Sequence, residues 1–185
     1  MGEGTDPTIA LYSTAKKLER GGADIIAIPC NTAHAYVERI QRHLDIPIVS
    51  ILTETTQHIV SHYPNVRKVG ILATNGTVGS GLYQTSLEQA GLEPVVPDEA
   101  FQALVMESIY GPNGVKAGHT SGKCRQQLLQ AVEHVLAKGA DAVILGCTEL
   151  PLIAPNPQES NAIALDPTLI LARKCVALAS DAEGV

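Results

Sequence analysis

Two cysteines end two similar stretches of the 185-residue chain, and they are the side chains best suited to chemistry. One stretch reads G-A-D-I-I-A-I-P-C-N-T over residues 22–32, and the other reads G-A-D-A-V-I-L-G-C-T-E over residues 139–149. In each, a mostly apolar run leads to a thiol, Cys30 or Cys147. Cysteine often simply fills a core. The small polar residues that follow each thiol instead favour a reactive position, where the start of a helix stabilises a thiolate.

Two thiols that face one another across a substrate suit one kind of reaction. Inversion of a carbon stereocentre needs a base on one face of the carbon and an acid on the other, with the roles exchanged for the mirror-image substrate. A thiol, with a reference pKa of about 8.5, can serve in either role near neutral pH. We therefore expect the sulfurs of Cys30 and Cys147 to point at one another across a small space.

Small polar side chains follow the same predicted strand ends. Hydroxyl groups and amides at helix N-termini bind anions without needing an arginine, so these residues predict a cradle for a carboxylate. The alternative role for each of them is helix capping or turn formation. The residues are Asn31, Thr32, Thr74, Thr77 and Thr148.

Three further residues have settings that suggest supporting roles. His34 follows Cys30 by four residues, so it could orient the thiol or contact a substrate. No further ligands at suitable spacing complete a zinc site with this pair, so we expect no metal. Glu149 either tunes Cys147 or caps the next turn. Lys116 lies in a glycine-rich loop, where a surface position is the default expectation.

The hydrophobic pattern alternates between strands and helices. Strands are predicted at 24–29, 46–50, 69–73, 93–96, 142–146 and 161–165, with helices between them and a turn at 74–77. This alternation indicates an α/β fold with doubly wound parallel sheets, in which ligands bind beyond the carboxyl ends of the strands. A break near Pro64 predicts a first domain over residues 1–65, completed by a helix at 166–180, and a second domain over residues 66–165.

Composition excludes several classes of function. A net charge of −6 and an aromatic content of 3% argue against nucleic acid as a partner. No apolar run approaches the roughly 18 residues of a membrane span, so we expect no membrane partner. Four cysteines without closely spaced pairs indicate reduced thiols and a cytoplasmic location.

Four ordered motifs resemble the aspartate/glutamate racemase superfamily. The segments are I-P-C-N-T-A-H at 28–34, L-A-T-N-G-T at 72–77, I-Y-G-P-N-G-V-K-A-G at 109–118 and I-L-G-C-T-E-L-P at 144–151. The pattern is most similar to aspartate racemase, because glutamate racemases typically carry His where this chain has Glu149, and they lack the His34 pattern.

The resemblance implies a PLP-independent, cofactor-free racemase that converts L-aspartate to D-aspartate between two cysteine thiols. It implies two similar domains with the active site in the cleft between them, and a homodimer. Cys30 and Cys147 would be the acid/base catalysts, and the five polar residues named above would hold the α-carboxylate. The resemblance implies that the substrate is a small acidic amino acid. Lys116 matches the family lysine that contacts the side-chain carboxylate of this substrate.

The resemblance also leaves alternatives open. Family members begin with about fifty residues that have no counterpart here, judged by the size of a βαβ unit plus one more strand, so the first domain is expected to be incomplete. A truncated, inactive racemase-like protein that only binds dicarboxylates or partners is therefore a second hypothesis. Another activity of the superfamily, such as hydantoin racemase or maleate isomerase, is a third.

Overall fold

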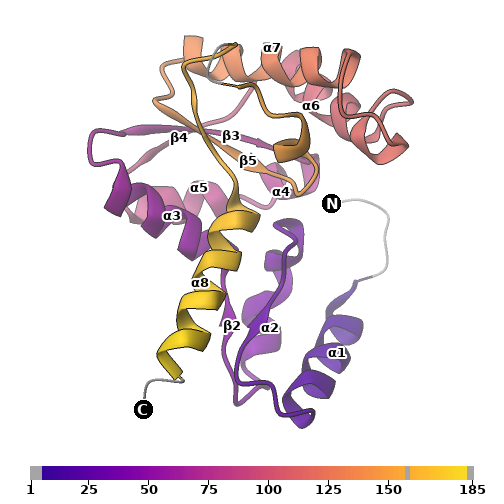
Figure 1. Cartoon of the computed structure of the whole chain (residues 1–185), viewed down its shortest axis with the longest axis vertical. Helices are drawn as coiled ribbons and strands as arrows, with labels where there is room; N and C mark the ends of the chain where they lie inside the picture. The colour runs from indigo at the N-terminus through magenta and orange to yellow at the C-terminus, as the bar shows by residue number, and fades with distance from the viewer. Residues whose placement is uncertain (1–5, 157–158, 183–185) are drawn as a thin grey trace.

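The larger of two parallel sheets lies in the upper half of Figure 1, between layers of helices. The computed structural model describes residues 6–156 and 159–182. The larger sheet has the strand order β4-β3-β5-β6, with every neighbouring pair parallel. Its strands are β3 (Lys68–Ala73), β4 (Glu93–Val95), β5 (Ala142–Gly146) and β6 (Ile163–Leu165).

Helices cover both faces of this sheet. Because side chains alternate along a strand, Ile71 of β3 packs on one face and its neighbour Leu72 on the other. The Ile71 face is covered by α3 (Ile51–His62), α5 (Leu82–Gln89) and α8 (Pro167–Ala182). The Leu72 face is covered by α6 (Glu99–Tyr110) and α7 (Lys123–Ala137). Strands buried on both sides explain the continuous apolar runs, and the predicted α/β class with parallel sheets is confirmed.

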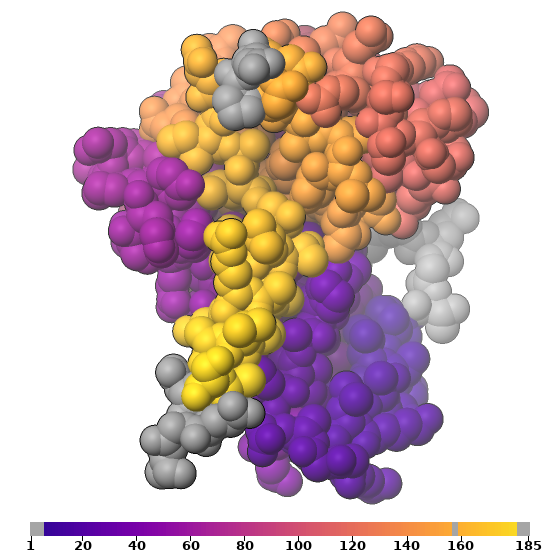
Figure 2. All heavy atoms as spheres, in the orientation of Figure 1, coloured from indigo at the N-terminus to yellow at the C-terminus, as the bar shows by residue number. Residues whose placement is uncertain are grey.

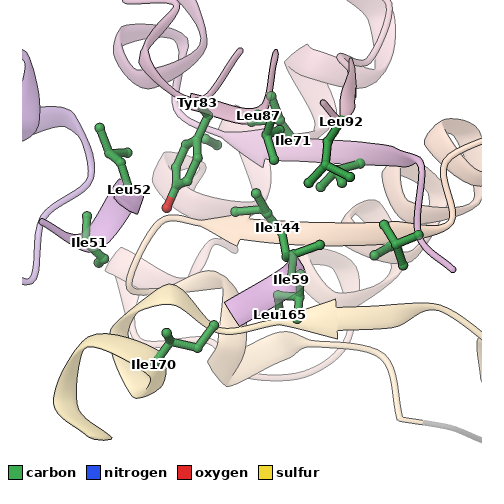
Figure 3. Packing of buried hydrophobic residues seen from close by; sticks show 14 of the residues in the cluster. Ile51, Leu52, Ile59, Ile71, Tyr83, Leu87, Leu92, Ile144, Leu165 and Ile170 are labelled. Carbon is green, nitrogen blue, oxygen red and sulfur yellow. The ribbon is translucent and has the colours of Figure 1, made fainter. Parts of the chain in front are cut away.

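The buried core on the Ile71 face includes the aromatic side chain of Tyr83. Tyr83 of α5 is fully buried, and Figure 3 shows it between Leu52 of α3 and the strand residues Ile71 and Ile144. Since Ile51 and Leu52 precede β3 in the chain, this core joins residues from both sides of position 65.

A smaller sheet contains only two strands within the described residues, β1 (Ile26–Ala27) and β2 (Ile48–Val49). Around it lie α1 (Thr8–Arg20), the 3₁₀ helix η1 (Thr32–Tyr36) and α2 (Val37–Gln41). Their buried side chains form a separate small cluster. Its members are Ala15, Ile26, Ile40, Leu44 and Ile48.

Two local predictions need correction. The run at 24–29 was expected to be a strand covered on both faces, but only Ile26 and Ala27 are strand and Ala27 is exposed. The reason is that, among the described residues, β1 has one pairing partner, β2. The turn expected at 74–77 is instead the start of a short helix, α4 (Asn75–Gly79), whose N-cap is Thr74.

Helix α8 links the two sheets. It packs against α3, and its Ile170 and Leu171 belong to the larger core. From there α8 extends along the side of the smaller unit, where the space-filling view shows it on the surface (Figure 2). Asp166 caps α8 by accepting hydrogen bonds from the backbone N–H groups of Thr168 and Leu169, at 2.9 and 3.1 Å.

Candidate active site

Apart from Lys116, the predicted site residues lie beyond the carboxyl ends of β1, β3 and β5. Cys30 follows β1, Thr74 follows β3 and Cys147 follows β5. In the parallel ladder, Ala73 is in register with Gly146, so Thr74 and Cys147 leave the sheet side by side. A contact between Thr32 and Thr74 adds the end of β1 to the same place. The topology therefore places residues next to Cys30 and Cys147 near Thr74.

Three threonine hydroxyls form a cluster where the two units meet. Thr32 Oγ1 lies 2.7 Å from Thr77 Oγ1 and 3.3 Å from Thr74 Oγ1, and the last two oxygens are 3.2 Å apart. Thr74 also accepts a bond from the Thr77 backbone N–H at 3.4 Å. Gly76 makes this approach possible, because a Cβ there would lie 3.1 Å from Thr32 Cγ2. Thr77 is only 1% exposed, so its hydroxyl bonds to its neighbours and not to water.

Asn31 is hydrogen-bonded by Tyr83, a residue that the sequence analysis did not single out. Tyr83 donates a hydrogen bond of 2.6 Å from its hydroxyl to Asn31 Oδ1. Burial raises the pKa of Tyr83, so the phenol stays protonated and remains a donor. The Asn31 side chain is buried, and its Nδ2 has no hydrogen-bond partner among the described residues. Asn31 therefore holds an unused donor directly beside Cys30, which fits an expected anion contact better than a cap.

His34 contacts the backbone of Cys30 and not its thiol. Ile51 N–H donates to His34 Nε2 at 3.1 Å, so the proton of the neutral ring is on Nδ1, which donates to the Cys30 carbonyl at 2.9 Å. Burial lowers the pKa of His34, outweighing its bond to that carbonyl. The neutral ring thus ties the peptide of Cys30 to the first residue of α3.

The second thiol lies in a network centred on Glu149. Cys147 Sγ and Thr148 Oγ1 both donate to Glu149 Oε2, each at 2.9 Å. Lys116 Nζ donates to Glu149 Oε1 at 2.6 Å and lies 5.5 Å from the centre of the Tyr110 ring. Lys116 belongs to η2 (Val115–Ala117), which packs against η3 (Leu150–Ile153) just after Cys147.

This network sets the protonation of its members. Burial and the bond to Glu149 raise the pKa of the Cys147 thiol to about 12. Burial opposes ionisation of Glu149, but hydrogen bonds from Cys147, Lys116 and Thr148 outweigh it and lower its pKa to about 2. The bond to Glu149 raises the pKa of Lys116. At neutral pH the network therefore holds a protonated thiol, a carboxylate and an ammonium group.

The expected site residues thus fall into two groups, one after β1 and β3 and the other around the end of β5, the strand that pairs with β3. The first comprises Cys30, Asn31, Thr32, His34, Thr74 and Thr77. The second comprises Lys116, Cys147, Thr148 and Glu149. Tyr83 and Tyr110 were missed. Both follow the ordinary apolar spacing of a helix, so nothing in the sequence separates them from core or surface tyrosines.

The described residues give no sign of a metal site or a membrane span. Within 6–156 and 159–182, no group of three or more His, Cys, Asp or Glu side chains is arranged to hold a metal ion. In the same part of the chain, no helix combines the length and apolar character needed to cross a bilayer. All four cysteines are free thiols.

Fold and site together define an α/β protein with two free thiols beyond the ends of parallel strands. The Asp/Glu/Hydantoin racemase family matches residues 2–175, and the chain belongs to this family. The predicted superfamily is therefore confirmed, and at the level of the family so is the predicted class, an amino-acid racemase.

Individual relatives agree with this assignment. The chain is 35% identical over 169 residues to the broad specificity amino-acid racemase RacX of Bacillus subtilis, covering 90% of this chain and 70% of that protein. It is 34% identical over 152 residues to a glutamate racemase of Aquifex pyrophilus, covering 79% and 55%. The crystal structure of an aspartate racemase homologue from Pyrococcus horikoshii OT3 superposes with a TM-score of 0.80 at 33% identity, covering 94% and 74%. The chain thus spans about half to three quarters of these relatives.

Proposed function

We propose that this chain racemises an acidic amino acid by proton transfer between Cys30 and Cys147, without a cofactor. The observation that carries the proposal is the position of Thr74, which contacts Thr32 two residues after Cys30 and follows the strand that pairs with the one preceding Cys147. Cys30 is exposed, and the Cys147 thiol is protonated and hydrogen-bonded to Glu149. Family membership supports the reaction class.

The protonation of Cys147 sets the order of events in one direction. Cys30, as the base, takes the α-proton, so the Cα–H bond breaks and its electron pair moves into the α-carboxylate. Cys147 then gives its S–H proton to the opposite face of the same carbon, forming a new Cα–H bond. Cys30 ends as a thiol and Cys147 as a thiolate. The mirror-image substrate runs the same steps with the roles exchanged.

Recognition is divided between the two groups. Asn31 Nδ2 is an unused donor beside Cys30, and with the hydroxyls of Thr32, Thr74 and Thr77 it would hold the α-carboxylate. Thr148, which is exposed, would add a hydroxyl from the side of Cys147. The side-chain carboxylate of the substrate would meet Lys116, because the Lys116 side chain is 45% exposed at the edge of the second group.

Aspartate is the proposed substrate, with glutamate as the alternative. Glu149 after Cys147-Thr148 favours aspartate, as does similarity to the aspartate racemase homologue. Similarity to a glutamate racemase supports glutamate, the longer diacid, as the alternative substrate. Side-by-side assays with aspartate and glutamate decide between them.

The test is hydrogen exchange in deuterated water. Loss of the α-proton NMR signal is followed for L- and D-aspartate with the wild-type chain, Cys30→Ala and Cys147→Ala. We expect wild-type exchange from both enantiomers, and a loss of about 10²- to 10⁴-fold in racemisation for each variant, the range of acid/base contributions. Cys175→Ala, which alters a thiol on α8, is the matched control. A folded wild-type chain that exchanges neither enantiomer refutes the proposal and leaves a binding role.

We further propose a cytoplasmic homodimer. Four free thiols suit a reducing compartment. Large apolar side chains exposed to solvent, such as Ile9, Leu152 and Val176, offer contact area for a second copy. Light scattering of the purified chain gives the oligomeric state directly, and a monomer at assay concentration contradicts the dimer.

A further inference from the structure

Both carboxylate oxygens of Glu149 are occupied by neighbouring donors. Oε1 accepts from Lys116, and Oε2 accepts from Cys147 and Thr148. The carboxylate is mostly enclosed, with its side chain 19% exposed, while the Lys116 side chain is 45% exposed. Lys116 is therefore open to solvent but already paired with an anion of this chain.

We propose that Glu149 is a specificity-determining residue that competes with the side-chain carboxylate of a ligand for Lys116. The inference rests on the proposed function only in taking Lys116 as the contact of that carboxylate. It assigns to Glu149 a role in diacid affinity, separate from its bond to the Cys147 thiol.

The competition follows from charge and geometry. Lys116 Nζ is 2.6 Å from Glu149 Oε1, a close charge-assisted bond. A second carboxylate at the same amine either replaces Oε1 or lies near Glu149 as a like charge. Both outcomes weaken diacid binding, because one loses the existing ion pair and the other adds repulsion. A ligand without a second carboxylate leaves the pair intact and does not meet this opposition.

Removing the charge of Glu149 should therefore strengthen diacid binding selectively. Partly exposed ion pairs contribute roughly 0.2–1 kcal/mol, which corresponds to about a 1.4- to 5-fold change in affinity. Glutamine at position 149 keeps acceptor and donor atoms near Cys147 and Thr148 while removing the competing negative charge. The substitution Glu149→Gln thus isolates the charge with little change in shape.

The experiment is a binding cycle with two probes. Calorimetry measures the dissociation constants of succinate, a diacid, and propionate, a monoacid, for the wild-type chain, Glu149→Gln, Lys116→Met and the double variant. We expect Glu149→Gln to tighten succinate binding about two- to fivefold with little change for propionate. In the Lys116→Met background the same substitution should have no such selective effect, because the contested amine is gone.

The outcomes separate this inference from the proposed function. An equal gain for both probes would show a general field effect, and a selective gain that persists without Lys116 would place the competition elsewhere. Either result overturns the inference, as does the absence of succinate binding in all four proteins. Because the readout is binding, a chain that fails to exchange the α-proton can still show the selective gain in succinate affinity. Conversely, a chain that exchanges the α-proton can lack this selective gain.

Discussion

Replacement of His34 should lower the stability of the fold, because His34 binds the backbone of Cys30 and of Ile51. His34→Ala leaves the buried N–H of Ile51 and the carbonyl of Cys30 without their partner. An unpaired buried donor costs about 1–3 kcal/mol and a lost bond to a more accessible carbonyl about 1 kcal/mol, so we expect the free energy of unfolding to fall by about 2–4 kcal/mol. Urea unfolding followed by circular dichroism at pH 7.5 measures this change.

His34 also predicts a pH dependence with a definite sign. Burial depresses the folded-state pKa of His34, so the unfolded chain binds its proton more readily. The stabilisation is complete above the unfolded pKa of about 6.5 and is lost as the pH falls toward the folded value, at up to about 1.4 kcal/mol per pH unit. His34→Gln, which cannot titrate, should be less sensitive to pH between 7.5 and 5 than the wild type.

The comparison has a matched control and a clear refutation. His119→Gln removes an exposed histidine and should leave both the stability and its pH dependence close to those of the wild type. If His34→Gln loses stability on acidification as steeply as the wild type, the buried His34 bridge between Cys30 and Ile51 is not the source of the pH dependence, which refutes the prediction.

Two other predictions concern the thiol network and the threonine cluster. Glu149→Gln should lower the pKa of the Cys147 thiol from about 12, since it removes the carboxylate that favours the protonated form; alkylation rate against pH, read by peptide mass spectrometry, tests this, and an unchanged midpoint contradicts it. Gly76→Ala should displace Thr32, which an added Cβ would meet at 3.1 Å, whereas Gly79→Ala in the same helix meets nothing within 4 Å. We expect a lower melting temperature and slower racemisation for Gly76→Ala alone, and equal behaviour of the two variants would refute the close approach.

Local patterns predicted most of the regular elements and the position of the thiols at strand ends. Helix α6 was expected at 98–109 and lies at Glu99–Tyr110, because its apolar period and the following glycine are local signals. The two cysteine stretches were placed at strand ends for the same reason, and both follow β-strands.

Longer-range features could not be predicted in this way. The shortness of β1 depends on which strands lie beside it, and no property of residues 24–29 encodes that. The ion pair between Lys116 and Glu149 joins residues 33 positions apart and needs η2 to pack on η3. His34 binds a carbonyl and an N–H group of the backbone, and because nearly every residue carries both groups, the sequence could not identify these partners.

The bond from Tyr83 to Asn31 has a consequence for how the chain can evolve. Tyr83 sits among the buried aliphatic residues of the larger core, yet its hydroxyl reaches the residue next to Cys30. A substitution that loosens the packing around this ring therefore shifts the neighbourhood of a thiol to which it makes no contact. Adaptation to a warmer or colder habitat can thus alter the proposed activity through core residues such as Leu87, with the segments around Cys30 and Cys147 unchanged.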